Sequence, residues 1–358
     1  MPRKTSKGPK TSLTKKICIV HMGAEKTGST ALQDWLELNK ATLQSNGIAL
    51  TGLHKAPANW AFVNYFQKNL DEWSVNLGIS TQEEKQTFFS GFADTFDEGL
   101  NALQSPVVVI SSEHFSSRLK TIDELRLLKK FLKFRFRETF IVGWFRPQWH
   151  VASSSWSTHL KSGGFVDLKT HLEQVHPRNY YFNYHLVASS WAQVFGKENC
   201  FFNQYKSDSD QSFDVRRDFT RVMNLIYPLG VGHGMKFPIA RENASLSLVQ
   251  ATLLKVMNSP EMAHTPSLSI KMRSDLKQRV MSEFVDFEED YSLRLSLDSQ
   301  TRIYRAFQDS NRRLAEEFLA GESFPAPLCE NPEYVSTEQM ADLLDRVTKR
   351  LLKAILNP

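Results

Sequence analysis

The segment HMGAEKTGSTALQ, residues 21–33, constrains the fold more strongly than any other part of the chain. A short β-branched run, KICIV at residues 16–20, precedes it and indicates a buried strand. Apolar residues at helical spacing follow it, namely Leu32, Trp35, Leu36 and Leu43. The glycines therefore lie in a turn between a strand and a helix, which is typical of α/β folds. The unpaired N–H groups that open such a helix favour an anion.

The two glycines of this segment have the spacing of a phosphate-binding loop, but the lysine is displaced. Gly23 and Gly28 match the Walker A pattern G-x-x-x-x-G-K-[ST], in which lysine directly follows the second glycine. Here Ser29 occupies that position, and Lys26 lies inside the loop. Hydroxyl groups add donors for an anion at Thr27, Ser29 and Thr30. The sequence thus predicts an anion-binding loop whose ligand differs from that of an ATPase.

A second candidate anion-binding segment follows another predicted strand. The run TFIVGWF at residues 139–145 indicates a buried strand, and an Arg-Pro turn and a helical stretch come after it. Arg146 follows the strand directly, and Ser154 lies eight residues later on the predicted helix. A guanidinium can bind phosphate through two hydrogen bonds, and a helical hydroxyl can add another. Taken alone, the pattern also fits a surface turn before a serine-rich helix.

A candidate general base lies between these two segments. The run SPVVVISSEHFSS, residues 105–117, is strongly β-branched and ends in Ser-Ser-Glu-His. Glu113 and His114 should point to opposite faces, because successive side chains of a strand alternate. A carboxylate in partly apolar surroundings can accept a proton near neutral pH. Both residues are therefore candidates for a base, although a histidine hydrogen-bonded in the wall of a site is the more common role for His114.

Together these segments resemble the sulfotransferases that use 3′-phosphoadenosine 5′-phosphosulfate (PAPS), in their bacterial and carbohydrate-modifying branches. K-[TS]-G-[ST]-T at the start of a helix is similar to the 5′-phosphosulfate loop of this family. The resemblance covers about residues 16–325, and its motifs are confined to residues 21–33, 107–115 and 139–164. It implies a P-loop-like α/β fold with a central parallel sheet flanked by helices and a helical C-terminal part.

The resemblance also implies roles for individual residues. Aligned on the family pattern, the end of the strand at 107–111 puts Glu113 at the position of the catalytic base, so we favour Glu113 and keep His114 as the alternative. Lys26 would also be catalytic and would stabilise the charge on the leaving bridging oxygen. PAPS would be bound by Lys26, Thr27, Gly28, Ser29, Thr30, Arg146, Ser154 and Arg241, the last within an Arg-x-Asn element. The product would be adenosine 3′,5′-bisphosphate (PAP), and no metal would be required.

The chain also departs from the family pattern. Ala31 stands where cytosolic members often carry a tryptophan that stacks on adenine, and the late Arg-Lys-Gly clamp of those members has no counterpart. The residue that contacts adenine is therefore left open. The candidates are four aromatic residues, of a kind that more commonly belongs to the core: Trp144, Trp149, Trp156 and Tyr205.

We therefore expect transfer of a sulfuryl group from PAPS to a hydroxyl or amine of a saccharide or small metabolite. One alternative is a P-loop-type nucleotide-dependent kinase, but it lacks the Walker lysine and a strand ending in a Mg²⁺-binding aspartate. Another is a non-catalytic nucleotide-binding protein, which the presence of both Lys26 and Glu113 disfavours.

The order of predicted elements indicates how the chain is organised. Strand patterns near residues 16–21, 107–111, 139–145 and 199–205 alternate with helical patterns near 29–45, 121–136, 148–161 and 183–195. This alternation predicts a parallel sheet covered on both faces, with ligands at the carboxyl ends of the strands. We expect a disordered basic tail at 1–15 and one domain at 16–358. Within that domain, an insertion at about 51–100 would line the acceptor cleft, and a helical portion would begin at about 245.

Composition is consistent with a soluble enzyme. The net charge of +5 suits an anionic donor and is too small to indicate a nucleic-acid partner. The three cysteines are widely spaced, as is typical of proteins in a reducing compartment. The basic N-terminal run lacks the apolar core of a signal peptide, and no apolar run is long enough to span a membrane. We therefore expect a cytoplasmic bacterial enzyme with a small-molecule or saccharide acceptor and no membrane partner.

Overall fold

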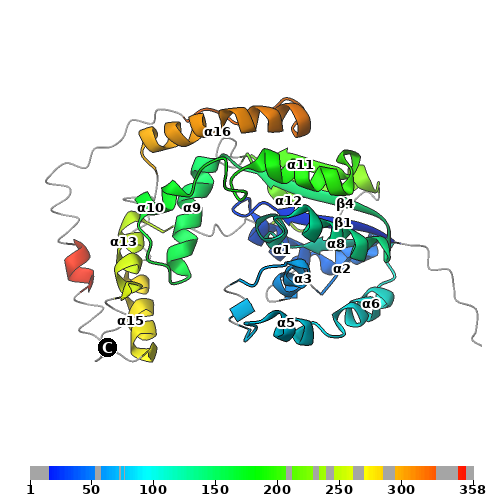
Figure 1. Ribbon diagram of the computed structural model, residues 1–358, viewed down its shortest axis with the longest axis horizontal. Helices are drawn as coiled ribbons and strands as arrows, with labels where there is room; N and C mark the ends of the chain where they lie inside the picture. Colours follow the sequence, from blue (N-terminus) through cyan, green and yellow to red (C-terminus); the bar gives the residue numbers. More distant parts are fainter. Residues whose placement is uncertain are drawn as a thin grey trace, which may run out of the picture. The chain divides into compact units, whose positions relative to one another are not determined.

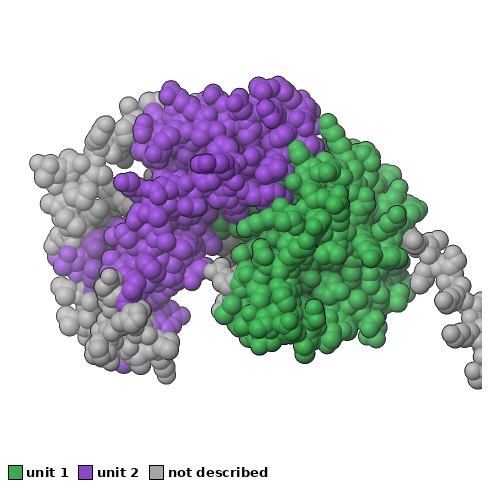
Figure 2. All heavy atoms as spheres, viewed as in Figure 1, with its two compact units in different colours: residues 1–145, 187–239 green, residues 146–186, 240–358 purple. Residues whose placement is uncertain are grey.

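The computed structural model divides into two compact units, which Figure 2 colours separately. Unit 1 consists of residues 1–145 and 187–239, and unit 2 of residues 146–186 and 240–358. The residues whose structure is described are 16–52, 58–71, 74–75, 77–206, 212–228, 234–238, 246–260, 270–284, 295–327 and 346–351. The predicted tail at 1–15 and Arg241 lie outside these ranges.

Unit 1 contains a five-stranded parallel sheet with the strand order β2-β3-β1-β4-β5. The strands are β1 (Lys16–Gly23), β2 (Ile48–Leu50), β3 (Val107–Ser111), β4 (Phe136–Phe145) and β5 (Cys200–Gln204). In the register of the sheet, His21 of β1 lies opposite Ser111 of β3, and Gly23 lies opposite Gly143 of β4. The segments that follow β1 and β3 therefore begin side by side at the carboxyl edge of the sheet.

Helices flank this sheet, as predicted (Figure 1). In unit 1 they are α1 (Ser29–Leu38), α2 (Lys40–Ser45), α3 (Ala58–Phe66), α5 (Gln82–Phe88), α6 (Phe92–Ala102), α7 (His114–Arg118), α8 (Ile122–Lys133) and α12 (Val215–Ile226), with most of α11 (Tyr184–Phe195). Alternate residues of β1, β3 and β4 pack against α1, α2 and α12 in one core, which includes Ile19, Trp35 and Phe219. The intervening strand residues are also buried, so both faces of the sheet are covered.

The described residues between 51 and 100 are largely helical, and aromatic rings from α3 and α6 pack together and against the helices after β3. Phe62 lies 5.3 Å from Phe66 and 5.4 Å from Phe96, measured between ring centroids. Phe131 of α8 packs against Phe66 at 5.2 Å, and Phe115 of α7 against Phe62 at 5.9 Å. These contacts attach α3 and α6 to the helices that follow β3, because tilted and edge-on rings pack favourably at such distances.

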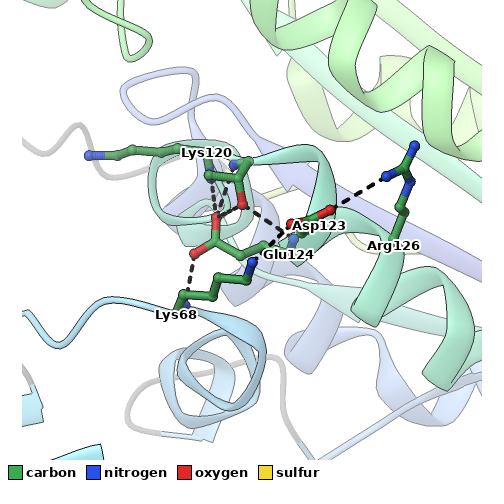
Figure 3. A network of polar contacts seen from close by, with 6 residues as sticks. Lys68, Lys120, Asp123, Glu124 and Arg126 are labelled. Atoms are coloured by element: carbon green, nitrogen blue, oxygen red, sulfur yellow. Dashed lines mark hydrogen bonds and ion pairs between the residues drawn. The ribbon is translucent and has the colours of Figure 1, made fainter.

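A polar network fixes the start of α8 to the segment after α3 (Figure 3). Thr121 and Glu124 form a capping box at the N-terminus of α8. The Glu124 carboxylate also accepts hydrogen bonds from the backbone N–H groups of Lys68, at 2.8 Å, and Lys120, at 3.0 Å. Outside this cap, the Lys68 ammonium lies 3.0 Å from Asp123. One buried carboxylate therefore joins the start of α8 to the segment after α3.

The described part of unit 2 is helical, which confirms the helical C-terminal portion. Its helices are α9 (Gln148–Lys161), α10 (Leu168–Glu173), α13 (Leu248–Met257), α15 (Ile270–Glu283) and α16 (Leu297–Phe318). The first residue of α9, Gln148, is fully buried and exchanges hydrogen bonds of 2.8 and 3.0 Å with Asn311 of α16. Around this pair, Trp149 and Ala152 pack with Ile303 and other apolar residues. The start of α9 is thereby fixed to α16.

The structure differs from the sequence prediction in several elements. The helical pattern at 29–45 is divided at Asn39, which caps α1 and binds the backbone carbonyls of Trp35 and Lys236. The pattern at 121–136 ends at Lys133, and Phe136 already belongs to β4. Strand β2 and helix α12 were not predicted. Within the described ranges, every helix is too short or too polar to cross a membrane.

Candidate functional site

The loop after β1 has a tight backbone that brings the start of α1 to the edge of the sheet. Gly23 and Gly28 have φ values of +105° and +79°, and Lys26 is also in the left-handed region, at +65°. The Thr27 hydroxyl is buried and donates a 2.6 Å hydrogen bond to the Ala24 carbonyl. Its proton is therefore used to close the loop. Thr30 is exposed in the first turn of α1, where the N–H groups have no partner within the helix.

Glycine is required at position 28 because the residues beyond β5 approach the loop closely. A Cβ atom at Gly28 would lie 3.0 Å from Cγ1 of Val215, the first residue of α12, and 3.2 Å from the Tyr205 ring. Tyr205 is half-buried beside the loop, whereas Trp144 is fully buried and donates to Asp218. Of the aromatic residues considered for an adenine contact, Tyr205 is thus the one that the structure places next to the loop. Trp149 and Trp156 are buried within unit 2.

The end of β1 also lies directly against the residues after β3. A Cβ atom at Gly23 would be 3.1 Å from both Cα and the carbonyl oxygen of Glu113, and 3.0 Å from the Ser116 hydroxyl. Glu113 precedes the first residue of α7, and its own backbone is already helical. The loop that contains Lys26 and the segment that contains Glu113 are therefore neighbours within unit 1. The parallel pairing of β1 with β3 brings together residues that are about 90 positions apart in the sequence.

The Glu113 carboxylate is held by a residue that the sequence analysis did not select. The side-chain amide of Gln33, on α1, donates a 2.7 Å hydrogen bond to Oε2 of Glu113. Gln33 is buried, and Glu113 is half-buried. Among the described residues no hydrogen bond reaches the other carboxylate oxygen, Oε1. Glu113 therefore keeps one oxygen that can accept a proton.

His114 is paired with a second carboxylate that the sequence analysis also missed, that of Glu25. Nδ1 of His114 lies 3.6 Å from Oε1 of Glu25, with both side chains about one-fifth exposed. Burial opposes the charge on His114, but the contact with Glu25 and the negative charges of Glu113 and Glu25 outweigh it and raise the pKa of His114. For Glu25, burial is outweighed by the contacts with His114 and Ser117 and by the charge of Lys26, so its pKa falls to about 2. The raised pKa shifts the His114 ring towards its protonated form, which cannot accept a further proton.

The other histidine at this edge, His21, belongs to the core. Its Nδ1 lies 2.8 Å from the Ser111 hydroxyl, and its ring packs against Trp144 and Phe219. Complete burial lowers the pKa of His21 to about 3. His21 is therefore neutral and connects β1 with β3 beneath the loop.

The second predicted segment lies in unit 2. Arg146 directly follows β4 and is half-buried, and its charge acts on the buried Tyr184 hydroxyl, whose pKa is raised mainly by burial. Ser154 is on the second turn of α9, and its hydroxyl donates to the His150 carbonyl at 3.0 Å. The structure thus brings Lys26, Glu113 and His114 together in unit 1, and it places Arg146 and Ser154 in unit 2.

Comparisons with known proteins leave the family open. No family model matches the sequence, and none of the characterised proteins with curated records matches it. The structure of a sulfotransferase from Alicyclobacillus acidocaldarius is similar at 15% sequence identity and a TM-score of 0.40, over 72% of this chain and 98% of that chain. This likeness is too distant to assign an activity, so the functional argument depends on the residues of the site.

Proposed function

We propose that this chain is a sulfotransferase that moves a sulfuryl group from PAPS to a hydroxyl or amine of a saccharide or small metabolite. The observation that carries the proposal is the contact between the loop after β1 and Glu113, with Gly23 packed on the Glu113 backbone. This contact puts an anion-binding loop beside a carboxylate with an available oxygen. Sulfuryl transfer needs both groups at one place, because charge grows on the leaving oxygen while the acceptor loses a proton.

The residues of the loop fit the phosphosulfate end of the donor. Gly28 has a positive φ and directly precedes α1, whose first N–H groups have no partner within the helix and would face an anion. Lys26 adds a positive charge at a point where a Walker A loop has none. Lys26 and the N–H groups would stabilise the charge on the departing bridging oxygen, and Glu113 would accept the proton of the acceptor.

The sequence resemblance extends the proposal to the rest of the donor. Arg146 and Ser154 have the residue types and spacing expected for a 3′-phosphate, and we propose that they contribute to the affinity for PAPS and PAP. Tyr205 is the candidate for the adenine contact, since it lies beside Gly28 with part of its ring accessible.

Binding of nucleotides to the purified full-length chain tests the donor. Calorimetry should show binding of PAP without Mg²⁺ and weaker binding of ATP with Mg²⁺. A preference for ATP with Mg²⁺ would instead indicate the kinase alternative. The Lys26→Ala variant serves as the control that separates binding at the loop from binding elsewhere.

Transfer of label from PAPS to a panel of saccharides and small metabolites tests the reaction. We expect a labelled product that depends on Glu113 and forms in the presence of a chelator. Tight binding of PAP without transfer to any acceptor of the panel or of a metabolite extract would support a non-catalytic nucleotide-binding protein.

A further inference from the structure

We infer that Gln33 is a positioning residue that fixes the orientation of the Glu113 carboxylate. The contact itself is observed in the structure, and its effect on catalysis rests on the proposed function. The Gln33 amide nitrogen lies 2.7 Å from Oε2 of Glu113, across 80 positions of the sequence. Gln33 does not touch the reacting atoms in this assignment and acts through Glu113.

The burial of Gln33 indicates that its contact with Glu113 is specific. Gln33 is 7% exposed and shares the buried face of α1 with apolar residues, including Leu32 and Leu36. A buried amide without a partner is costly, so a glutamine at such a position depends on its hydrogen bonds. An apolar residue would suit this face equally well if packing were its only role. The polar side chain is thus explained by its acceptor, the Glu113 carboxylate.

The geometry of the contact determines what Gln33 contributes. α1 begins at Ser29, immediately after the anion-binding loop, so Gln33 joins the base to the element that carries the loop. The amide occupies Oε2 and leaves Oε1 for the proton of the acceptor. A fixed carboxylate can face the acceptor without first losing rotational freedom, and a displacement of about 1 Å can reduce a rate about 100-fold.

The charged groups around Glu113 do not replace this contact. On α7, His114 is paired with Glu25 and Arg118 with Asp71, at 3.3 Å. Lys26 and Glu25 belong to the loop itself. These groups set the local electrostatic field, whereas Gln33 supplies a directed hydrogen bond to Oε2.

The variants Gln33→Leu and Gln33→Glu test the inference in the transfer assay. Q33L removes the donor with little change in volume, and kcat should fall about 10- to 100-fold while KM for PAPS changes much less. Q33E should have a low kcat at high pH, where two carboxylates repel each other. Its activity relative to the natural chain should recover at low pH, where the introduced carboxyl is protonated and can donate to Glu113.

Asn39 supplies the matched control on the same helix. It is buried and hydrogen-bonded to Trp35 and Lys236, and it does not contact Glu113. Asn39→Leu should lower stability and leave kcat and its pH dependence unchanged. If Q33L and N39L reduce stability equally and neither lowers kcat, Gln33 has only a structural role and the inference is overturned.

A measurement without turnover separates this inference from the proposed function. The side-chain amide resonance of Gln33, observed in protein labelled at glutamine, should shift when Glu113 is replaced by alanine. This shift would support the contact even if the natural chain transferred no sulfuryl group, in which case only the proposed function would fail. A resonance that is unchanged in E113A would overturn the inference.

Discussion

Each of the two candidate anion-binding segments leads into a helix with a buried glutamine, but the two glutamines have different partners. Gln33 on α1, in unit 1, donates to the carboxylate of Glu113. Gln148 on α9, in unit 2, exchanges hydrogen bonds with Asn311, whose side chain is uncharged. An amide pair can fix a helix but cannot influence a proton transfer. The two glutamines therefore differ in what they hold: Gln33 orients an ionisable side chain, whereas Gln148 orients a neutral one.

The largest effect should come from replacing the reacting groups of unit 1. Lys26→Ala and Glu113→Gln should each lower the transfer rate by about 100- to 10,000-fold, because a charge-stabilising group or a general base is lost. Rates measured with labelled PAPS and an active acceptor would show this loss. Circular dichroism should show an unchanged fold.

His114→Ala is the control for the assignment of the base. Because His114 is paired with Glu25, its loss should reduce the rate less than the loss of the Glu113 carboxylate. An active E113Q variant together with an inactive H114A variant would transfer the role of base to His114.

Arg146→Ala tests the binding role assigned to unit 2. The loss of a charge-assisted hydrogen bond to phosphate should weaken binding of PAP by about 1.5–3 kcal/mol. Calorimetry measures this change directly, and Arg137→Ala, at an exposed position near the start of β4, is the matched control. An unchanged affinity for PAP in R146A would remove Arg146 from the site.

Gln148→Leu tests whether the amide pair of unit 2 is purely structural. The variant leaves Asn311 buried without its partner and should lower the free energy of unfolding by about 1–3 kcal/mol. Chemical denaturation followed by tryptophan fluorescence measures this loss. The double variant Q148L/N311L removes both side-chain amides and should recover part of the stability, because only the Phe182 carbonyl, which also accepts from Gln148 at 3.2 Å, still lacks its donor. A double variant that is as unstable as Q148L would contradict this account.

The smallest effect should come from the Glu25–His114 pair and should depend on pH. The pKa of His114 is raised above its ordinary 6.5, so its contribution is complete below pH 6.5 and disappears as the pH rises through the higher folded-state value. The pKa of Glu25 is lowered from 4.5 to about 2, so its contribution is complete above pH 4.5 and disappears as the pH falls through 2. The pair should stabilise the fold most between pH 4.5 and 6.5.

Denaturation of Glu25→Gln across this range measures the contribution of the pair. The natural chain should exceed E25Q in stability by ~1 kcal/mol between pH 4.5 and 6.5, and by less at pH 9. His21→Ala would be a poor control because His21 belongs to the core. His185→Ala is preferable, because His185 is half-buried and contacts a carboxylate, that of Glu317, in unit 2. A difference between E25Q and the natural chain that does not vary with pH would contradict the ion pair.

Much of the sheet was accessible to sequence reasoning because its strands are long apolar runs. β3 was predicted at its observed bounds, and the end of β4 at Phe145 was also predicted. β1 extends to Gly23, beyond its predicted end at 21, and β4 begins at Phe136, before its predicted start at 139. β2 has only three residues, Ile48–Leu50, which give no usable periodicity. The sequence does carry a signal for α12: an Asp214 cap precedes apolar residues at helical spacing, namely Val215, Phe219, Val222 and Met223.

The contacts of the candidate site were less accessible to sequence reasoning. Gln33 and Glu113 are 80 positions apart, and only the pairing of β1 with β3 makes them neighbours. In the sequence, Glu25 is an ordinary loop residue. Its partner, His114, is brought to it only by the pairing of β1 with β3. Local patterns therefore indicated which segments carry polar groups, whereas their partners depended on the register of the sheet.

Two of the glycines limit which amino acids the site can tolerate. A Cβ atom at Gly143 would lie 2.8 Å from the carbonyl oxygen of Gly23, and one at Gly23 would meet Glu113 and Ser116 at 3.0–3.1 Å. The backbones of β4, β1 and the segment after β3 therefore lie side by side, too close for a methyl group at either glycine. Distant relatives with the same arrangement should be recognisable by paired glycines at these two positions, even where the lysine and the carboxylate have diverged.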